Sequence, residues 1–502
     1  MRMGNSASGV RDRPGRIAFQ AAALVSLFAI GAVLESLRLT SLHDSEIWRH
    51  LRVGNWILAN GSWPRAGLFS QVSNREWRDF SWGYDLLSAS AYSVLGLLAL
   101  PLLRMGFEVM LAVSTFILAG GRRHFWNALA FSAVAQYLMG SMGPGAAWCS
   151  VALFGIELVL LQEIRSTGNV RLMYALPAMF LLWANLDVGF VFGLVTYVLF
   201  LLAFLIEAHG QHANWQWTQK PSEKLSIGTA TIVGLGSVMA SLINPYGIYT
   251  YPEFFSNQAD AISVNLPGHA AMGFHRPQDY VLLLLTMTAF LVLGLRRSLR
   301  IFPLCLLTGC TVLAFRSESN GWLAALACLT VIGERTPDDE REKASVPLTF
   351  HWDWKALGAA TALSLVIAGL VLSASVPRRA EGLVARISDR FPVQACNFIR
   401  QHDLPQPIFN SLAWGGFLIW YLPEYPVAID GRRGLYSEQE ESDYSTVMKG
   451  EMPFKEFAPI AKAQTLLLEK GNVMGEVLRD LPGFQVAYED SLAIVFLRHR
   501  KE

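Results

Sequence analysis

The sequence predicts a polytopic α-helical membrane protein of about eleven spans that ends in a small α/β domain. Of its 502 residues, 52% are hydrophobic and 16% are charged, whereas soluble proteins carry about 25% charged residues. Long apolar runs recur through the first three quarters of the chain, and a more polar segment with short strand and helix patterns follows. We therefore expect a membrane domain over residues 1–376 and an α/β domain over residues 377–502.

The first apolar run, residues 17–37, is expected to be an uncleaved membrane helix. Arginines precede it and no small-residue cleavage site follows it, which distinguishes it from a signal peptide. Some of the later runs are shorter than the ~20 residues that a perpendicular crossing needs. The further expected spans are 98–120, 125–141, 145–163, 172–185, 188–206, 226–243, 279–295, 301–315, 320–333 and 356–375.

The distribution of Lys and Arg predicts the orientation, because cytoplasmic turns are enriched in these residues. If the first span leaves the cytoplasm, the basic turns all fall on the cytoplasmic side; they are 122–123, 165–171, 220–224, 296–300 and 335–343. The first outward loop, 38–97, is an exception, since its six arginines are accompanied by five acids. We expect a bacterial inner-membrane protein with a cytoplasmic N-terminus and a periplasmic C-terminal domain.

Charge and cysteine content exclude some classes of function. The formal net charge of +1 does not favour a nucleic-acid partner, which calls for a strongly basic surface. None of the five cysteines has metal-ligand spacing, and only Cys396 lies in the polar tail, so the tail cannot form an internal disulfide.

The first outward loop is expected to hold two helices that lie along the membrane surface. In residues 44–60, Ile47, Leu51, Gly54 and Leu58 share one helical face, and Gly61 follows the end of that helix. A second helix is expected from near Ser81.

The tail shows the pattern of alternating helices and strands. PVQACNFIRQHDLPQPIFN predicts helix, turn and strand, and VAIDG at 427–431 predicts a strand that ends in an acidic turn. AQTLLLEKG predicts another strand, and FQVAYEDSLAIVFLRH predicts a hairpin with its turn at residues 489–491.

The stretch HDSEIWRH at 43–50 places two acids directly after the first span. Two carboxylates at this spacing can bind Mg²⁺ or Mn²⁺ through oxygen, or one of them can act as a general base on an acceptor hydroxyl. The alternative is a helix cap: Asp44 would accept a backbone hydrogen bond, and Glu46 would complement the helix dipole. The spacing leaves both interpretations open.

Four motifs in order resemble those of a group of bacterial multi-span proteins related to the GT-C superfamily of polyprenyl-phosphate-dependent membrane glycosyltransferases. Residues 44–58, DSEIWRHLRVGNWIL, resemble D-x-D-x-W-W-H-L-R-x-G-x-W-I-L, and WANLDVG at 183–189 resembles W-A-N-x-H-x-G. INPYG at 243–247 is similar to N-P-x-G, and residues 413–436 are similar to W-G-G-Y-L-x-W…D-G-R. The resemblance covers most of the chain.

The resemblance implies a function and several site residues. In the superfamily the first outward loop carries an acidic motif with a catalytic or metal-binding role, and the donor is a sugar on a lipid phosphate. Here Glu46 stands where the second Asp is expected, and Asp187 stands where the group usually has His. We therefore take Asp44, Glu46 and Asp187 as candidate catalytic residues, with Asp44 and Glu46 as possible Mg²⁺ or Mn²⁺ ligands.

A lipid phosphate also needs cations, and Arg binds phosphate with fixed geometry. The candidates on the expected outward side are Arg49, His50, His275, Arg276 and Arg316. For each, the alternative is a surface charge or an interfacial anchor. Arg104, inside an apolar run, either snorkels outward or faces a polar cavity.

The C-terminal motif offers weaker candidates. Asp430 and Arg432 are candidate acceptor-binding residues, although Asp-Gly is also simply a good turn. Trp414 and the two glycines after it are expected where backbone approaches closely.

The sequence thus predicts a membrane glycosyltransferase that moves a sugar from a polyprenyl-phosphate donor to an unidentified glycan, lipid or protein acceptor. The alternative is a membrane scaffold or accessory subunit that kept the fold without the chemistry and binds a partner through its C-terminal domain. A transporter comes third, because no inverted repeat is visible. No G-x-S-x-G, P-loop, H-E-x-x-H or C-x-x-C motif points to another reaction.

Overall fold

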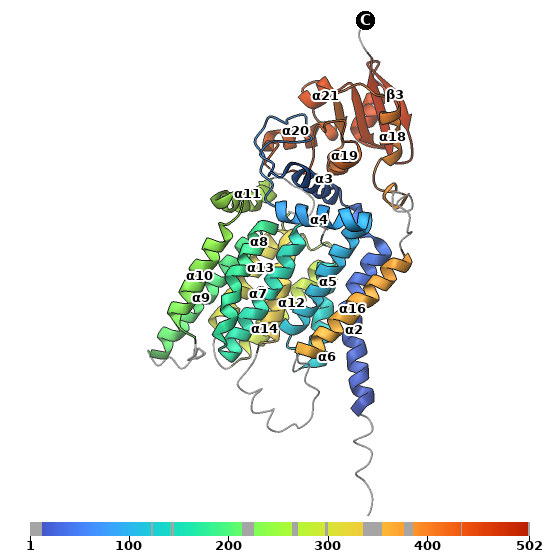
Figure 1. Cartoon of the computed structure of the whole chain (residues 1–502). Coiled ribbons are helices and arrows are strands. Elements are labelled where there is room, and N and C mark those ends of the chain that lie inside the picture. The colour runs from blue at the N-terminus through green and yellow to red at the C-terminus, as the bar shows by residue number, and fades with distance from the viewer. Residues whose placement is uncertain are drawn as a thin grey trace, which may run out of the picture. The chain divides into compact units, whose positions relative to one another are not determined.

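A computed structural model describes the chain in segments and divides it into two compact units (Figure 1). The bundle unit comprises Met1–Arg38, Arg104–Met142 and Ala147–Ser375, and the mixed unit comprises Leu39–Leu103, Gly143–Ala146 and Val376–Glu502. The described residues are 13–121, 124–140, 142, 145–212, 225–263, 270–296, 300–334, 354–375, 385–432 and 434–499. The expected basic turns at 122–123, 220–224 and 335–343, and the expected domain boundary at 376–377, lie outside them.

The bundle unit consists of helices. Each of the eleven expected spans coincides with one of its α-helices, which confirms the polytopic helical fold. The α-helices are α2 (Arg13–Arg38), α5 (Ala99–Leu118), α6 (Phe125–Met139), α7 (Ala147–Thr167), α8 (Ala175–Leu186), α9 (Phe190–His212), α10 (Ile227–Ser241), α11 (Thr250–Ser263), α12 (Pro277–Gly294), α13 (Ile301–Arg316), α14 (Gly321–Ile332) and α16 (Trp354–Ser375). Short 3₁₀ helices are η3 (Val170–Tyr174), η4 (Gly247–Tyr249) and η5 (Glu318–Asn320).

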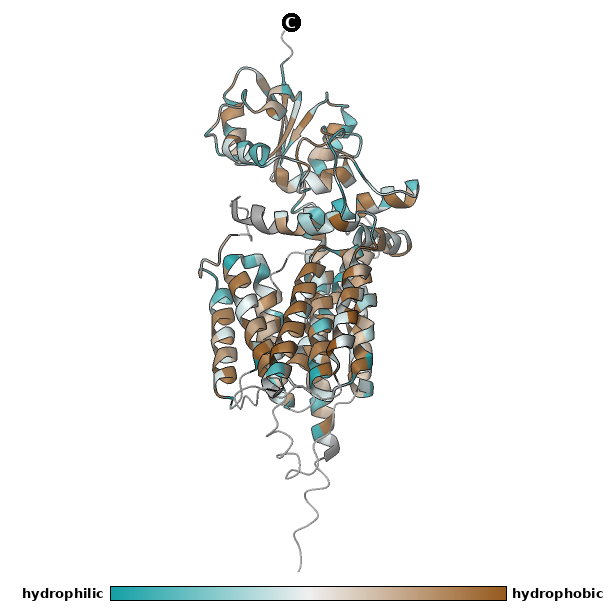
Figure 2. Cartoon of the chain, turned by 90° about the vertical axis from the view of Figure 1, so that its left-hand side faces the viewer, coloured by the Kyte–Doolittle hydropathy of each residue, from teal (hydrophilic) through white to brown (hydrophobic). Residues whose placement is uncertain are grey.

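Length and composition mark this chain as a multi-pass membrane protein. Among the described residues, six helical stretches are long and apolar enough to cross a bilayer. Four shorter apolar helical stretches of 10–17 residues lie in the bundle unit. In Figure 2 apolar residues cover most of the length of these helices. A bilayer offers no hydrogen bonds to the backbone, so a continuous helix is the expected form for each run.

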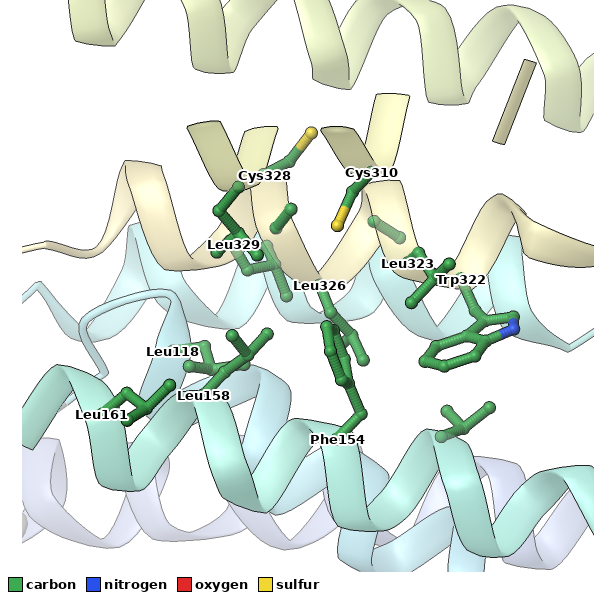
Figure 3. Packing of buried hydrophobic residues seen from close by; sticks show 14 of the residues in the cluster. Leu118, Phe154, Leu158, Leu161, Cys310, Trp322, Leu323, Leu326, Cys328 and Leu329 are labelled. Atoms are coloured by element: carbon green, nitrogen blue, oxygen red, sulfur yellow. The ribbon is translucent and has the colours of Figure 1, made fainter. Parts of the chain in front are cut away.

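The core of the bundle unit lies where α7, α13 and α14 meet (Figure 3). Phe154 of α7 packs edge-on against the Trp322 ring of α14, with 5.4 Å between ring centroids. Leu158 and Leu326 are fully buried in the same cluster. α14 is buried along nearly its whole length, so it forms the central helix of this core.

At one end of the bundle unit, five charged side chains from different helices form a buried network. Glu334 accepts a hydrogen bond from Arg296 at 2.6 Å and forms an ion pair with Arg300 at 3.0 Å. Arg165 pairs with Glu207 at 3.2 Å and lies 4.0 Å from Glu334. All five side chains are at most 13% exposed. The network therefore ties α7, α9, α12, α13 and α14 together at this end.

Replacing Glu334 with Ala is expected to lower the free energy of unfolding by about 3 kcal/mol, because it leaves buried guanidinium groups without their shared carboxylate. Glu424→Ala is the control, since the pair that Glu424 forms with Arg400 is exposed and should contribute less than about 1 kcal/mol. Reversible denaturation in detergent measures both values. Equal losses for the two variants would contradict the structural role of the network.

The mixed unit joins the first loop to the C-terminal segment. Its helices are η1 (Thr40–His43), α3 (Ser45–Asn60), α4 (Trp82–Leu95), η2 (Gly96–Leu98), α18 (Val393–Gln401), η6 (Leu412–Trp414), α19 (Gly415–Tyr421), α20 (Glu438–Met448), α21 (Ala458–Lys462) and α22 (Val473–Arg479). Its strands are β1 (Ile408–Asn410), β2 (Thr465–Glu469), β3 (Phe484–Glu489) and β4 (Ala493–Arg498). The strand order is β1-β2-β4-β3, with β1 and β2 parallel and the other pairs antiparallel.

The predicted local elements of this unit are mostly present. The expected helix and strand that end at Gln401 and Asn410, the strand in AQTLLLEKG and the terminal hairpin are all present. The predicted strand at 427–431 is wrong, because this segment is not part of the sheet. Val427 instead makes an isolated bridge with Ser70 of the first loop, and Asn410 binds the backbone of residues 428 and 429 through its amide.

The first loop packs with the C-terminal segment in the mixed unit, whereas the sequence predicts it as part of the membrane domain. A small hydrophobic core is shared between the two segments, formed by Val53, Ile57, Trp77, Ile429, Leu435 and Tyr436. Arg75 of the loop donates two hydrogen bonds to Glu440, at 2.6 and 2.8 Å. Gln71 donates to the backbone of Ile408 and Pro426. These contacts between distant parts of the sequence create the mixed unit.

Candidate functional site

The acidic motif lies at the N-terminus of α3. Asp44 is the N-cap, and its Oδ1 accepts a hydrogen bond from the backbone N–H of Glu46 at 2.8 Å. The helix ends as expected at Asn60, with Gly61 in the left-handed conformation at φ 59°. The free N–H groups and the dipole of a helix N-terminus favour negative charge. Both acids therefore lie at a position that favours negative charge.

One turn into α3, Glu46 and Arg49 form an ion pair. Nε of Arg49 donates to Oε2 of Glu46 at 2.7 Å, and the Glu46 side chain is 34% exposed. Burial alone would lower the pKa of Arg49, but Glu46, Asp85 and Asp79 raise it above its ordinary value. The guanidinium therefore keeps its charge although it is largely buried.

His50 connects this ion pair to two buried acids. Its Nδ1 lies 2.5 Å from Oδ1 of Asp85, and Nη2 of Arg49 lies 3.2 Å from its Nε2. The same Nη2 lies 3.5 Å from Nδ1, so the guanidinium lies over the face of the imidazole, close to both ring nitrogens. Asp79 is close enough to Asp85 for their charges to interact. Burial, and after it the charge of Asp85, raises the pKa of Asp79 well above its ordinary value. Both acids are almost completely buried.

Three glycines let other segments approach α3 closely. A Cβ at Gly54 would lie under 3.0 Å from the Asp85 carbonyl oxygen, so this glycine allows α3 and α4 to pack together. A Cβ at Gly416 would overlap the backbone of Ser45, and one at Gly431 would overlap the Glu46 carboxylate. The predicted close approach of backbone after Trp414 is thus confirmed. The first and fourth sequence motifs meet at the N-terminus of α3.

Gly431→Ala should disturb the acidic pair without unfolding the protein. The atoms nearest to the Cβ would be those of the Glu46 carboxyl group, which can rotate away and leave Arg49. We expect a stability loss of about 1 kcal/mol and loss of the ion pair between Glu46 and Arg49. Thermal unfolding and a structure of the variant test this. A Glu46 carboxylate that stays beside Arg49 in the variant would show that Gly431 does not constrain its position.

Asp430 and Arg432 form a completely buried ion pair in the mixed unit. Nη2 of Arg432 lies 2.8 Å from Oδ2 of Asp430, and its Nη1 donates to the carbonyl of Leu68 at 2.5 Å. Tyr436 also donates to Asp430 at 3.0 Å. Burial would raise the pKa of Asp430, but Arg432 and these hydrogen bonds lower it below its ordinary value. The arrangement fastens the D-G-R turn to the first loop and leaves the role of the pair in acceptor binding a prediction.

The second and third motifs lie in the bundle unit and contact each other. Asp187 follows α8, and its Oδ2 accepts hydrogen bonds from Ser150 and from the backbone of Gly189, the latter at 2.9 Å. Trp183 donates to Ser150 at 2.8 Å. Asn185 donates to the carbonyl of Ile243 in INPYG at 2.9 Å. The motif residues therefore build one local turn around the Asp187 carboxylate.

The remaining cationic candidates also belong to the bundle unit. Arg276 is the N-cap of α12 and is paired with Asp279 and Glu318, both at 2.9 Å. His275 and Arg316 are exposed. Arg104 does not reach outward: its Nε donates to Glu108 at 2.9 Å, and its guanidinium lies 3.5 Å from the centre of the Trp148 ring. The structure thus places Asp44, Glu46, Arg49 and His50 together and Asp187, His275, Arg276 and Arg316 in the other unit.

The carboxylates of the motif form a poor cation site. Oδ1 of Asp44 already accepts a hydrogen bond from a backbone N–H, and Oε2 of Glu46 accepts one from Arg49. In the described segments, no group of three or more His, Cys, Asp or Glu side chains is arranged to hold a metal ion. A divalent cation prefers several oxygen ligands and would here have to displace the Arg49 guanidinium. The residues present fit a cap and an ion pair, so we derive no chemical step through a metal.

Asp79 and Asp85 were not identified from the sequence. Both are in WRDFSWGYD: Asp79 lies between the two loop helices, and Asp85 lies in the first turn of α4. They count among the five acids of that loop. The available signal was the number of charged residues in the loop. Any of its acids and arginines that are buried must form ion pairs. Which of them would contact His50 depends on how α3 and α4 pack, and the sequence does not show this.

Comparisons with known proteins identify the fold. No protein-family model and no curated protein sequence matches the chain. A crystal structure of ArnT from Cupriavidus metallidurans bound to undecaprenyl phosphate matches with a TM-score of 0.50 and 13% identity, over 96% of this chain and 98% of that one. A structure of the archaeal oligosaccharyltransferase AglB from Archaeoglobus fulgidus, in complex with an inhibitory peptide and a dolichol-phosphate, matches with a TM-score of 0.49 and 11% identity, over 89% of this chain and 69% of that one. The chain has the GT-C fold.

Proposed function

We propose that this protein is a membrane glycosyltransferase that moves a sugar from a polyprenyl-phosphate donor to an acceptor at the periplasmic face of a bacterial inner membrane. The observation that carries the proposal is the match over almost the full length of both chains to ArnT bound to undecaprenyl phosphate. The gathering of Asp44, Glu46 and Arg49 within one turn of α3 supports it independently.

Each of these side chains has a chemical task in such a transfer. The acceptor oxygen attacks the anomeric carbon, the bond from that carbon to the phosphate oxygen breaks, and the lipid phosphate leaves. Asp44 takes the proton of the acceptor hydroxyl, with Glu46 assisting. Arg49 stabilises the charge on the leaving phosphate, because a guanidinium donates to phosphate oxygens with fixed geometry. His275, Arg276 and Arg316 are further candidates for phosphate contact, and Asp187 is a further candidate carboxylate.

The test is a transfer assay with the purified full chain in lipid nanodiscs. Undecaprenyl-phosphate-linked sugars are offered with glycan, lipid and peptide acceptors, and release of undecaprenyl phosphate is measured with Mg²⁺ and with EDTA. We expect release that depends on an acceptor and continues in EDTA, because the acidic pair is already occupied by protein groups. If the wild-type chain neither binds undecaprenyl phosphate nor releases it from any donor, the proposal is wrong.

A second candidate function is a non-catalytic accessory subunit that works through its C-terminal segment. One observation favours it: α19 and the D-G-R turn press against the start of α3, with glycines where Cβ atoms would overlap Ser45 and Glu46. Arg49 and His50 are also more than 90% buried. Such a subunit would tolerate Asp44→Asn without loss of function, whereas a transferase would not.

A further inference from the structure

Arg49 is held from two sides, which leaves one part of its guanidinium for a ligand. Its Nε donates to Glu46 at 2.7 Å, and its Nη2 lies over the His50 ring, 3.2 Å from Nε2 and 3.5 Å from Nδ1. In the described part of the chain, no hydrogen-bond acceptor contacts its Nη1, and that atom is not fully buried. The orientation of Nη1 therefore follows from what holds the other two nitrogens.

Asp85 fixes the ring of His50 against which Arg49 lies, because its Oδ1 lies 2.5 Å from Nδ1 in a short hydrogen bond. The Tyr84 ring packs edge-on against the imidazole, with 5.1 Å between centroids. The histidine is thereby fixed in orientation.

Burying two acids at this point costs free energy, which a functional role of their charge would offset. Asp85 is fully buried and Asp79 is 2% exposed. Replacing buried ionic groups with well-packed apolar residues often stabilises a protein, so stability alone is a poor reason for this arrangement. Burial raises the pKa of both acids, and Asp85 is the one whose Oδ1 faces Nδ1 of His50.

We propose that Asp85 is a positioning residue that acts through His50 to orient Arg49 toward the phosphate of a lipid-linked ligand. This inference rests on the proposed function. It assigns to Asp85 the task of holding the imidazole of His50 in the orientation against which the Arg49 guanidinium lies.

The experiment is a double-mutant cycle on the affinity for undecaprenyl phosphate, measured with the full chain in detergent micelles. Arg49→Gln should weaken binding ~10- to 100-fold, the range for loss of a hydrogen bond to a charged group. Asp85→Asn should weaken it ~3- to 10-fold, because the carboxylate that holds the His50 ring in place is gone. In the double variant Asp85→Asn should add almost nothing, since its effect passes through Arg49.

The control is Glu440→Gln, which loses an ion pair with Arg75 in the same unit but away from α3. Its thermal unfolding should shift downward while its affinity stays at the wild-type value, so lost stability can be separated from lost positioning. Asp85→Glu should restore part of the affinity.

Each outcome has one meaning. If Asp85→Asn binds like wild type, or if its effect adds fully to that of Arg49→Gln, Asp85 does not act through Arg49 and the inference is wrong, while the proposed function stands. If the wild-type chain itself does not bind undecaprenyl phosphate, the proposed function is wrong, and so is the inference that rests on it.

Discussion

Asp44→Asn is expected to lower the rate of sugar transfer by about 10²- to 10⁴-fold, the usual contribution of a general base. The substitution tests the charge alone. Asn is as good an N-cap as Asp, so its amide oxygen can accept the hydrogen bond from the backbone N–H of Glu46 that the Asp44 carboxylate accepts. The free energy of unfolding should therefore change by less than about 0.5 kcal/mol. Initial rates and thermal unfolding, measured on the same nanodisc preparation, give both values.

Asp44→Ala is the companion variant, because it removes the cap as well as the charge. It should lose the same activity and in addition about 1 kcal/mol of stability. If Asp44→Asn retains full activity while Asp44→Ala loses stability, Asp44 is only a helix cap. The interpretation of HDSEIWRH as a helix cap, and with it the accessory-subunit function, would then be favoured.

Gly416→Ala is expected to have the largest effect on stability in the mixed unit, a loss of about 3 kcal/mol. A Cβ at this position would lie under 3.0 Å from the backbone oxygen and carbon of Ser45. Backbone at the start of a capped helix cannot rotate away as a side chain can, so α19 would have to move off α3. Such a movement would expose part of the surface that the two helices bury against each other.

Gly483→Ala is the matched control, since a Cβ there would meet no atom within 4 Å and the change should be within about 0.5 kcal/mol. Denaturant titration in detergent compares the two variants. Equal stability of both would mean that α19 and α3 do not pack as described, and the contact between the first and fourth motifs would have to be abandoned.

The sequence predicted the membrane helices well because each apolar run must satisfy its own backbone hydrogen bonds. All eleven expected spans coincide with helices, and the helix that ends at Asn60 and the helix that begins after Ser81 are also present. α11 was missed, since TYPEFFSNQADAIS lacks the length and apolar composition of a span. The segment at 427–431 looked like a strand, but its backbone is paired with the first loop, a partner more than 350 residues away.

The candidate site shows the same division between local and distant information. The positions of Asp44 and Glu46 at a helix N-terminus follow from local spacing, and the ion pair of Glu46 with Arg49 follows from helical periodicity. The contact of His50 with Asp85 depends on the crossing of two helices, and the contact of Gly431 with Glu46 depends on how the C-terminal segment folds back. The pattern of residues along the chain contains neither of these contacts.

The most direct test of the account is a structure of the purified chain with undecaprenyl phosphate bound. The account predicts a lipid phosphate within hydrogen-bond distance of Nη1 of Arg49, with the Asp44 carboxylate facing the position of the sugar. A well-ordered structure in which the C-terminal segment still covers the start of α3 and no lipid phosphate is bound beside Arg49 would contradict it.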